Sequence, residues 1–337
     1  MLEIGSEFWK AEVIEQKNDK FSDMTKWFLS GQNALNYIIS DIKLKYNVQT
    51  VALPSWCCDS MIIPFLINDF IVDFYSVVIE DGCLKQKMEK KSDVILVMDY
   101  FGFSTDYDFS AYQGIVIRDI THSLFAKNYQ DADYFFGSLR KWTGICTGGY
   151  AWCKGTWSEN NPVNETDNRY VSIRKKAMIE KSTFINGNQS NKFYLATFKA
   201  AEDLLDEDNL QGIYKAWDKD IEVASKLDID LIKSQRRKNA QRLLEELSEL
   251  ALFKKIGEDD CPLFIPILVE KRDELKEYLI NNHIYCPCHW PISKYHKLND
   301  ETRSLYDREL SLVCDQRYSE ADMNRMISLI LDWRKNN

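Results

Sequence analysis

The first half of the chain alternates short apolar runs with helical patterns. Each run is rich in β-branched or aromatic residues and ends at a turn signal or a charge, which predicts a β-strand. The five runs lie within residues 50–56, 70–78, 93–102, 114–123 and 131–139. Residues 30–46 instead place Ala34, Leu35, Ile38 and Ile39 on one face of a helix. Alternation of this kind predicts a mostly parallel sheet with helices on its faces.

The second half differs because helical patterns predominate from about Asp206 onward. Residues 228–250 predict a long amphipathic helix with a charged outer face. After it come a strand within 263–270, a helix followed by an extended piece within 272–290, and a closing helix within 319–333. These elements predict a smaller α+β unit.

We therefore expect an α/β protein with two domains. The large domain comprises residues 30–245, the small C-terminal α+β domain comprises residues 246–337, and residues 1–29 pack near the small domain. The active site should lie outside the carboxyl ends of the large-domain strands, facing the small domain.

Composition and charge argue against several kinds of partner. The 337 residues carry a formal net charge of -9, which opposes the phosphate backbone of a nucleic acid. No apolar run is long enough to cross a membrane and the N-terminus lacks a signal-peptide pattern, so we expect a cytoplasmic protein without a membrane partner. The nine cysteines include no C-x-x-C pair, and Cys286, Cys288 and His289 are interpreted as packing residues, so we expect no metal site.

Lys141 raises a question of chemistry because it follows Ser138 in an S-x-x-K pattern. That pattern occurs in β-lactamases, but their S-D-N and K-T-G partner motifs are absent from this sequence, and Ser138 closes an apolar strand instead of opening a helix. A solvated loop lysine is the simplest alternative. The context favours a functional lysine, since Asp119 and His122 follow the preceding strand and a glycine pair comes after the lysine.

This set of residue types suits pyridoxal phosphate. A lysine amine can condense with the aldehyde of that cofactor, a carboxylate can keep its pyridine nitrogen protonated, and hydroxyl and backbone N–H groups can hold its phosphate. Lys141, Asp119 and Ser138 supply the side chains, and the helix that begins "SGQNAL" presents the N–H groups of its first turn.

The same residues resemble a known family, the pyridoxal-phosphate sugar aminotransferases typified by DegT and DnrJ, which have the fold type I architecture. The similarity runs along most of the chain, in "EIGSEFW", "SGQNAL", "ALPSWCCDS", "VIRDITHS", "GSLRKWTGICTGG" and "HWPIS". The resemblance implies that Lys141 forms the Schiff base, that Asp119 contacts the pyridine nitrogen and that His122 lies beside the ring. It also implies further cofactor contacts from Gly31, Gln32, Asn33, Trp56 and Ser138.

Three departures from the family pattern indicate a divergent branch. Arg118 stands where glutamate is usual, Gln32 stands where threonine is frequent, and the interval from Asp119 to Lys141 is shorter than in typical members.

Several of these candidates also have a purely structural interpretation. Asp119 could cap a loop, His122 and Trp56 could be core residues, and Ser138 could be a turn hydroxyl.

The resemblance implies an aminotransferase that acts as a homodimer. It would move an amino group from an amino-acid donor, by resemblance glutamate, to the keto group of a sugar carried on a nucleotide. Two alternatives stay open. One is another pyridoxal-phosphate reaction, such as that of a lyase or a desulfurase, and the other is a non-catalytic relative, to which Arg118 and the short interval point.

Overall fold

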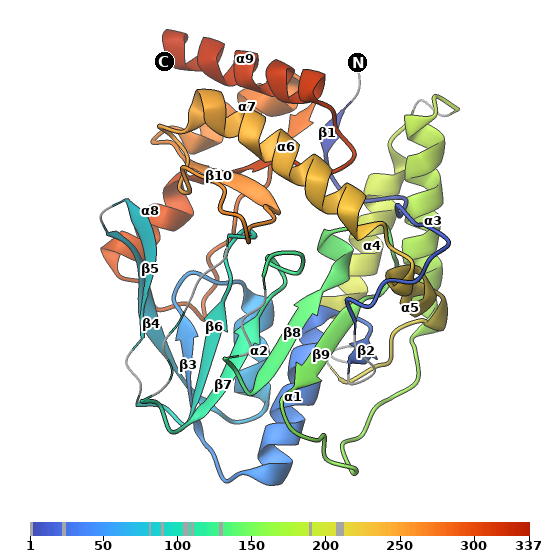
Figure 1. The fold of residues 1–337 in the computed structure, drawn as a ribbon, viewed down its shortest axis with the longest axis vertical. Coiled ribbons are helices and arrows are strands. Elements are labelled where there is room, and N and C mark those ends of the chain that lie inside the picture. The colour runs from blue at the N-terminus through green and yellow to red at the C-terminus, as the bar shows by residue number, and fades with distance from the viewer. Residues whose placement is uncertain are drawn as a thin grey trace.

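The computed structural model describes residues 3–21, 25–80, 82–88, 91–103, 107, 109, 111–127, 131–188, 191–206 and 212–337 (Figure 1). An eight-stranded sheet occupies one part of the molecule, and a layer of C-terminal helices lies across one end of it (Figure 1).

The large sheet has the strand order β2-β9-β8-β7-β6-β3-β4-β5. Five neighbouring strands run parallel, namely β4 (Ile71–Glu80), β3 (Thr50–Pro54), β6 (Val94–Met98), β7 (Ile115–Asp119) and β8 (Tyr134–Ser138). Antiparallel pairings add β5 (Cys83–Lys87) at one edge, and β9 (Gly149–Cys153) and then β2 (Lys26–Phe28) at the other. Each predicted run contains or overlaps one of the five parallel strands, so the mostly parallel sheet is confirmed.

Burial explains why the central strands are easy to recognise in the sequence. Every residue of β6 and of β8 is buried, as expected for parallel strands that are covered on both faces. Helix α1 (Gly31–Lys45) packs on β8 and β9, and α2 (Asp59–Ile67) packs on β4.

Two further helices, α3 (Asn168–Ile185) and α4 (Phe193–Asp206), pack against each other before α5 (Asp218–Ser225). The sequence patterns placed the start of the helix-rich part at about Asp206, so α3 and α4, which come before that point, correct this boundary. The buried face of α3 includes Arg174 and Lys181, and these charges hide its apolar period.

The C-terminal part contains the predicted strand and helices together with two elements that the patterns missed, α8 and β12. In chain order its elements are α6 (Ile229–Leu247), β10 (Phe264–Leu268), α7 (Arg272–Asn281), β11 (Ile284–Tyr285), α8 (Asp300–Arg308), β12 (Glu309–Val313) and α9 (Glu320–Asn336). Strand β10 pairs antiparallel with β12, and α6 packs against α9. The first strand of the chain, β1 (Ile4–Gly5), pairs with β11. The N-terminal segment thus contacts the C-terminal part through β1 and the large sheet through β2, and the exact domain boundaries stay a prediction.

The parallel strands end at one edge of the sheet, which faces the C-terminal layer (Figure 1). Asp119 is the last residue of β7 and Ser138 is the last residue of β8. Strand β8 continues into a short 3₁₀ turn, η1 (Leu139–Lys141), which brings Lys141 to the same edge. Among the described helices, none is both long enough and apolar enough to cross a bilayer.

Candidate active site

A cavity of about 700 Å³ opens at the carboxyl ends of the parallel strands. Met98, Asp119 and Phe136 are paired neighbours on β6, β7 and β8, and all three line it. Six of the eight predicted site residues also line it, namely Gly31, Gln32, Asp119, His122, Ser138 and Lys141. Asn33 and Trp56 are not among the lining residues.

The turn after β8 brings Lys141 into the cavity, where its side chain is exposed. The glycine pair that follows allows β9 to return beside the start of α1. Gly148 has a φ of 131°, and a Cβ atom on Gly149 would lie 1.8 Å from the Ser30 carbonyl oxygen. Only glycine fits where the backbone of β9 approaches that of Ser30 so closely. The glycine pair therefore permits the turn that leads from Lys141 back into the sheet.

The start of α1 and the end of β8 together form a place for an anion. The Ser30 Oγ accepts from the Asn33 N–H at 3.2 Å, while helix geometry leaves the N–H groups of Gly31 and Gln32 without an intrahelical acceptor. A Cβ atom on Gly31 would lie 3.3 Å from the Cβ atom of Ser138, so the two segments are in close contact. Free N–H groups at a helix N-terminus, beside a hydroxyl, suit a phosphate.

Asn33 has a structural task instead. Its side chain is buried, and its Oδ1 accepts from the Tyr214 N–H at 3.0 Å. Its contribution to the site is therefore to hold the loop around residue 214 against α1.

Asp119 is a buried carboxylate without an arginine partner. Its Oδ1 accepts from the Thr121 N–H at 2.8 Å. Burial raises the pKa of Asp119 to about 6, against the opposing effects of the Thr121 hydrogen bonds and the Lys141 charge. A buried carboxylate of this kind gains stability from a cationic N–H group brought into the cavity.

His122 is buried, and neither ring nitrogen has a hydrogen-bond partner among the described residues. Its ring stacks on that of Trp290, with the ring centres 5.6 Å apart, and meets the ring of His289 edge-on at 5.3 Å. Burial, together with the Lys141 and His289 charges, holds the pKa of His122 well below its usual value. A neutral imidazole in a cavity wall, with both nitrogens unpaired, can form hydrogen bonds with a ligand that enters the cavity.

Trp56 lies behind the cavity wall. It is fully buried, its ring stacks on Tyr100 with ring centres 5.1 Å apart, and its Nε1–H donates to the His289 carbonyl oxygen at 2.7 Å. This position favours the alternative interpretation of Trp56 as a core residue. The described residue that stacks on His122 at the cavity is Trp290, which lies in the "HWPIS" stretch but was not predicted as a site residue.

Arg118, one of the three departures from the family pattern, is not among the residues that line the cavity. Its Nε donates to both carboxylate oxygens of Asp99, at 3.0 and 3.1 Å, and its Nη1 donates to Asp131. Neighbouring residues on a strand face opposite sides of a sheet, so Arg118 and Asp119 serve separate environments. Arg118 therefore compensates the buried Asp99 carboxylate and does not line the cavity.

A charged wall forms another side of the cavity, and the sequence motifs missed it. Arg174 donates from Nη2 to Glu7 at 2.7 Å and from Nη1 to Glu202, and Arg140 donates to the same Glu202 oxygen at 2.9 Å. All four residues line the cavity. They come from the N-terminal segment, η1, α3 and α4, and only the position of Arg140 next to Lys141 is a local signal.

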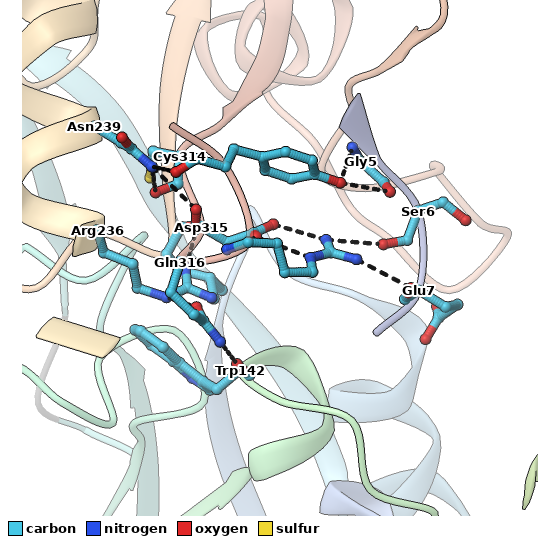
Figure 2. A network of polar contacts seen from close by, with 12 residues as sticks. Gly5, Ser6, Glu7, Trp142, Arg236, Asn239, Cys314, Asp315 and Gln316 are labelled. Carbon is cyan, nitrogen blue, oxygen red and sulfur yellow. Dashed lines mark hydrogen bonds and ion pairs between the residues drawn. The ribbon is translucent and has the colours of Figure 1, made fainter. Parts of the chain in front are cut away.

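The N-terminal residues 5–8 also line the cavity, and C-terminal side chains hold them there (Figure 2). Arg317 donates to the carbonyl oxygens of Ser6 and Glu7, at 3.1 Å each, and binds the Asp315 carboxylate through Nη2 at 2.7 Å. The Gly5 N–H donates to the Tyr318 hydroxyl at 2.8 Å. The cavity is thus completed by three stretches of chain that are distant in sequence.

The residues weighed as a metal cluster have other partners. The His289 Nδ1 lies 2.8 Å from the Ser311 hydroxyl, and the Cys286 thiol contacts Met326. Within the described part of the chain, no group of three or more histidine, cysteine, aspartate or glutamate residues is arranged to hold a metal ion.

Comparisons with known proteins find similarity in structure only. No protein-family model matches the chain, and no curated protein matches it in sequence. PseC of Helicobacter pylori, an aminotransferase involved in the biosynthesis of pseudoaminic acid, is 12% identical, with a TM-score of 0.66 over 97% of this chain and 99% of that one. A DegT DnrJ EryC1 StrS aminotransferase from Brucella abortus is 15% identical, with a TM-score of 0.61 over 92% of this chain and 85% of the other. DesV of S. venezuelae is 14% identical, with a TM-score of 0.62 over 92% and 84%. The chain therefore has the fold of the DegT/DnrJ-type aminotransferases, as its sequence motifs predicted.

Proposed function

We propose that the protein is a pyridoxal-phosphate-dependent aminotransferase that moves an amino group from an amino-acid donor to the keto group of a sugar. The observation that carries this proposal is the presence, in one cavity, of Lys141, the buried Asp119 carboxylate and the start of α1 beside Ser138. An amine, a carboxylate and a phosphate site are the groups that this cofactor needs.

The residues present fit the cofactor in three independent ways. The N–H groups of Gly31 and Gln32 have no acceptor within their helix. Both nitrogens of His122 are buried without a partner among the described residues. Burial raises the pKa of Asp119 to about 6, so its carboxylate would gain from a cationic N–H group beside it. A phosphate would accept from the N–H groups at the start of α1 and a pyridinium nitrogen would pair with Asp119, while the cofactor's polar ring substituents could bond to His122.

Each residue then has a defined task. Pyridoxal phosphate supplies an aldehyde that condenses with amines and a ring that withdraws electrons from the carbon bearing the amino group. Lys141 would anchor the cofactor and, once displaced by the donor amine, would move the proton at the donor carbon. Asp119 would keep the pyridine nitrogen charged, His122 would lie against the ring, and Ser138 with the first turn of α1 would hold the phosphate.

Structural neighbours support the substrate class. DesI, 14% identical with a TM-score of 0.61, was solved in the presence of its TDP-sugar product. A putative sugar aminotransferase from Streptococcus pneumoniae was solved in its PMP form. We propose the corresponding substrates here, a nucleotide-linked keto sugar as acceptor and glutamate as donor, in a cytoplasmic homodimer. Light scattering coupled to gel filtration tests the dimer.

Desulfurase chemistry is the alternative with a structural observation to weigh, because it needs a reactive thiol. Among the cysteines of the described residues, Cys58 and Cys286 line the cavity. Burial raises the pKa of Cys58, and it raises that of Cys286 to about 12, so both thiols are held in the less nucleophilic form. The site therefore favours amino transfer over sulfur transfer.

The test is cofactor capture by Lys141. The purified protein, supplied with pyridoxal phosphate, should be yellow, and borohydride should attach the cofactor to a peptide that contains Lys141. Lys141→Ala should abolish this attachment completely, while Lys154→Ala, which removes an exposed lysine outside the cavity lining, should leave it unchanged. Glutamate should then bleach the yellow form, and cysteine in the presence of a reductant should release no sulfide. A colourless protein that cannot be reconstituted would refute the proposal.

A further inference from the structure

Arg236 on α6 is a fully buried arginine that lines the cavity. Its Nε donates to the Gln316 side-chain oxygen at 2.8 Å, and its Nη1 donates to the Leu263 carbonyl oxygen at 3.0 Å. Its Nη2 is buried and has no hydrogen-bond partner among the described residues. The side chain is therefore positioned firmly and keeps one donor group unused.

The partners of Arg236 are all neutral, unlike those of the other cavity arginines. Arg140 and Arg174 share Glu202, and Arg317 binds Asp315. Asp315 is also the acid whose charge acts on Arg236, but it is committed to Arg317 through two nitrogens. Burial lowers the pKa of Arg236, which is the direction expected for a cation without a counter-ion. A buried charge of this kind is costly unless an anion joins it.

Two sets of contacts place Arg236 close to the proposed reaction site. Its guanidinium lies over the ring of Trp142, 4.5 Å from the ring centre, and Trp142 follows Lys141 directly (Figure 2). On the other side, Leu263 precedes Phe264, whose ring meets that of His289 at 5.2 Å, and His289 in turn meets His122. Arg236 thus contacts the residue that follows Lys141 in the chain, and it is connected to His122 through Leu263, Phe264 and His289.

We propose that Arg236 binds a carboxylate of the amino-acid donor through its free Nη2. This inference rests on the proposed function, since it names the group that recognises the donor. A carboxylate fits better than the diphosphate of a nucleotide, because only one nitrogen of the buried guanidinium lacks a partner among the described residues, whereas a diphosphate carries several charges that call for several donors. Aromatic and apolar neighbours also exclude water there, which strengthens a single charged hydrogen bond.

The test measures binding of succinate, an unreactive dicarboxylate, by calorimetry on the full-length protein loaded with pyridoxal phosphate. Arg236→Gln should weaken succinate binding by about 10- to 100-fold and raise the donor concentration for half-maximal bleaching to a similar extent. The cofactor absorbance and the maximal rate of bleaching should stay within about threefold of the parent protein. Arg237→Gln is the matched control, because Arg237 lies next along α6 and donates to the backbone of residues 257–260.

Other outcomes would decide against the inference. Unchanged succinate affinity in Arg236→Gln would overturn it, and so would a loss of thymidine diphosphate binding with succinate binding intact. If Arg236→Gln fails to fold, as judged by circular dichroism, Arg236→Lys keeps the charge but loses the planar fork, and it should still weaken succinate binding. The two proposals fail separately. A colourless protein that binds succinate through Arg236 would refute the aminotransferase and leave the anion site standing, whereas an active enzyme with Arg236-independent succinate binding would do the reverse.

Discussion

Two sides of the cavity are built in different ways. One side comes from consecutive strand ends of the large sheet and carries Asp119, Ser138 and Lys141 within one stretch of sequence. The other side is assembled from the N-terminal segment, α3, α4, α6 and the residues after β12, and most of its charges are held in ion pairs.

The two sides differ in whether a buried acid has an arginine partner. Asp315 is buried beside Arg317, so although burial alone would raise its pKa, the arginine charge and hydrogen bonds hold the pKa of this carboxyl below its usual range. Asp119 is equally buried, lacks such a partner, and has its pKa raised to about 6. The paired acid stabilises the architecture, and the unpaired acid is available for chemistry. Perturbed and unpaired groups of this kind mark functional sites.

The largest expected effect on stability comes from breaking the pair that closes the cavity. Arg317→Leu leaves the Asp315 charge buried without its partner, since both side chains are about 5% exposed or less. We expect a loss of about 3–5 kcal/mol in the free energy of unfolding at pH 7, measured by urea denaturation. The loss should shrink as the pH falls toward 4, because protonation then neutralises Asp315.

The matched control replaces both partners. Asp315→Asn combined with Arg317→Leu should recover much of the lost stability, because the ion pair is removed as a whole and Asp315 no longer stands as a buried charge without Arg317. If the single and double variants are equally unstable, the cost lies in packing and not in the charge.

Asp119→Asn should have the opposite effect and should increase the stability of the cofactor-free protein. The folded pKa of about 6 exceeds the ordinary value of 3.8, so the folded cofactor-free protein holds the Asp119 proton more tightly than the unfolded chain does. The charged carboxylate then destabilises the fold progressively as the pH rises through this window. Asp119→Asn should stabilise the cofactor-free protein by up to about 3 kcal/mol at pH 7 and by almost nothing below pH 4.

Urea denaturation at the two pH values checks this prediction, with the exposed Asp307→Asn as the control. Asp119→Asn should also lose amino-transfer activity. A variant that is less stable than the parent protein at pH 7 would mean that Asp119 supports the fold as Asp315 does, and the contrast between the two sides would disappear.

The smallest expected effect concerns Trp56, which supports the cavity wall from behind. Trp56→Phe removes the hydrogen bond to the His289 carbonyl oxygen and should cost about 1–2 kcal/mol of unfolding free energy. The spectrum and affinity of bound pyridoxal phosphate should stay unchanged, because Trp56 does not line the cavity. A clear fall in cofactor affinity would restore the ring contact implied by the family resemblance.

Much of the large sheet could be predicted from the sequence, and much of the charged side could not. Strands β6 and β8 are buried throughout, so their apolar runs are local signals that survive in a single sequence. Arg174 and Lys181 lie on the buried face of α3, and their burial depends on Glu7, far away along the chain. No pattern within α3 could reveal a partner at such a separation.

The sequence by itself determined which residues end neighbouring strands, and therefore that Asp119, Ser138 and Lys141 meet at one edge of the sheet. Parallel strands end at the same edge of a sheet, so the prediction of parallel strands is enough to place these carboxyl ends along one edge. Only the tertiary structure decided which charges are paired and which are not. Arg118 and Arg236 are both buried arginines in sequence-predicted elements, yet one faces Asp99 and Asp131 while the other faces neutral groups and the cavity. The reason is physical, because the cost of a buried charge depends on neighbours that the fold brings from distant parts of the chain.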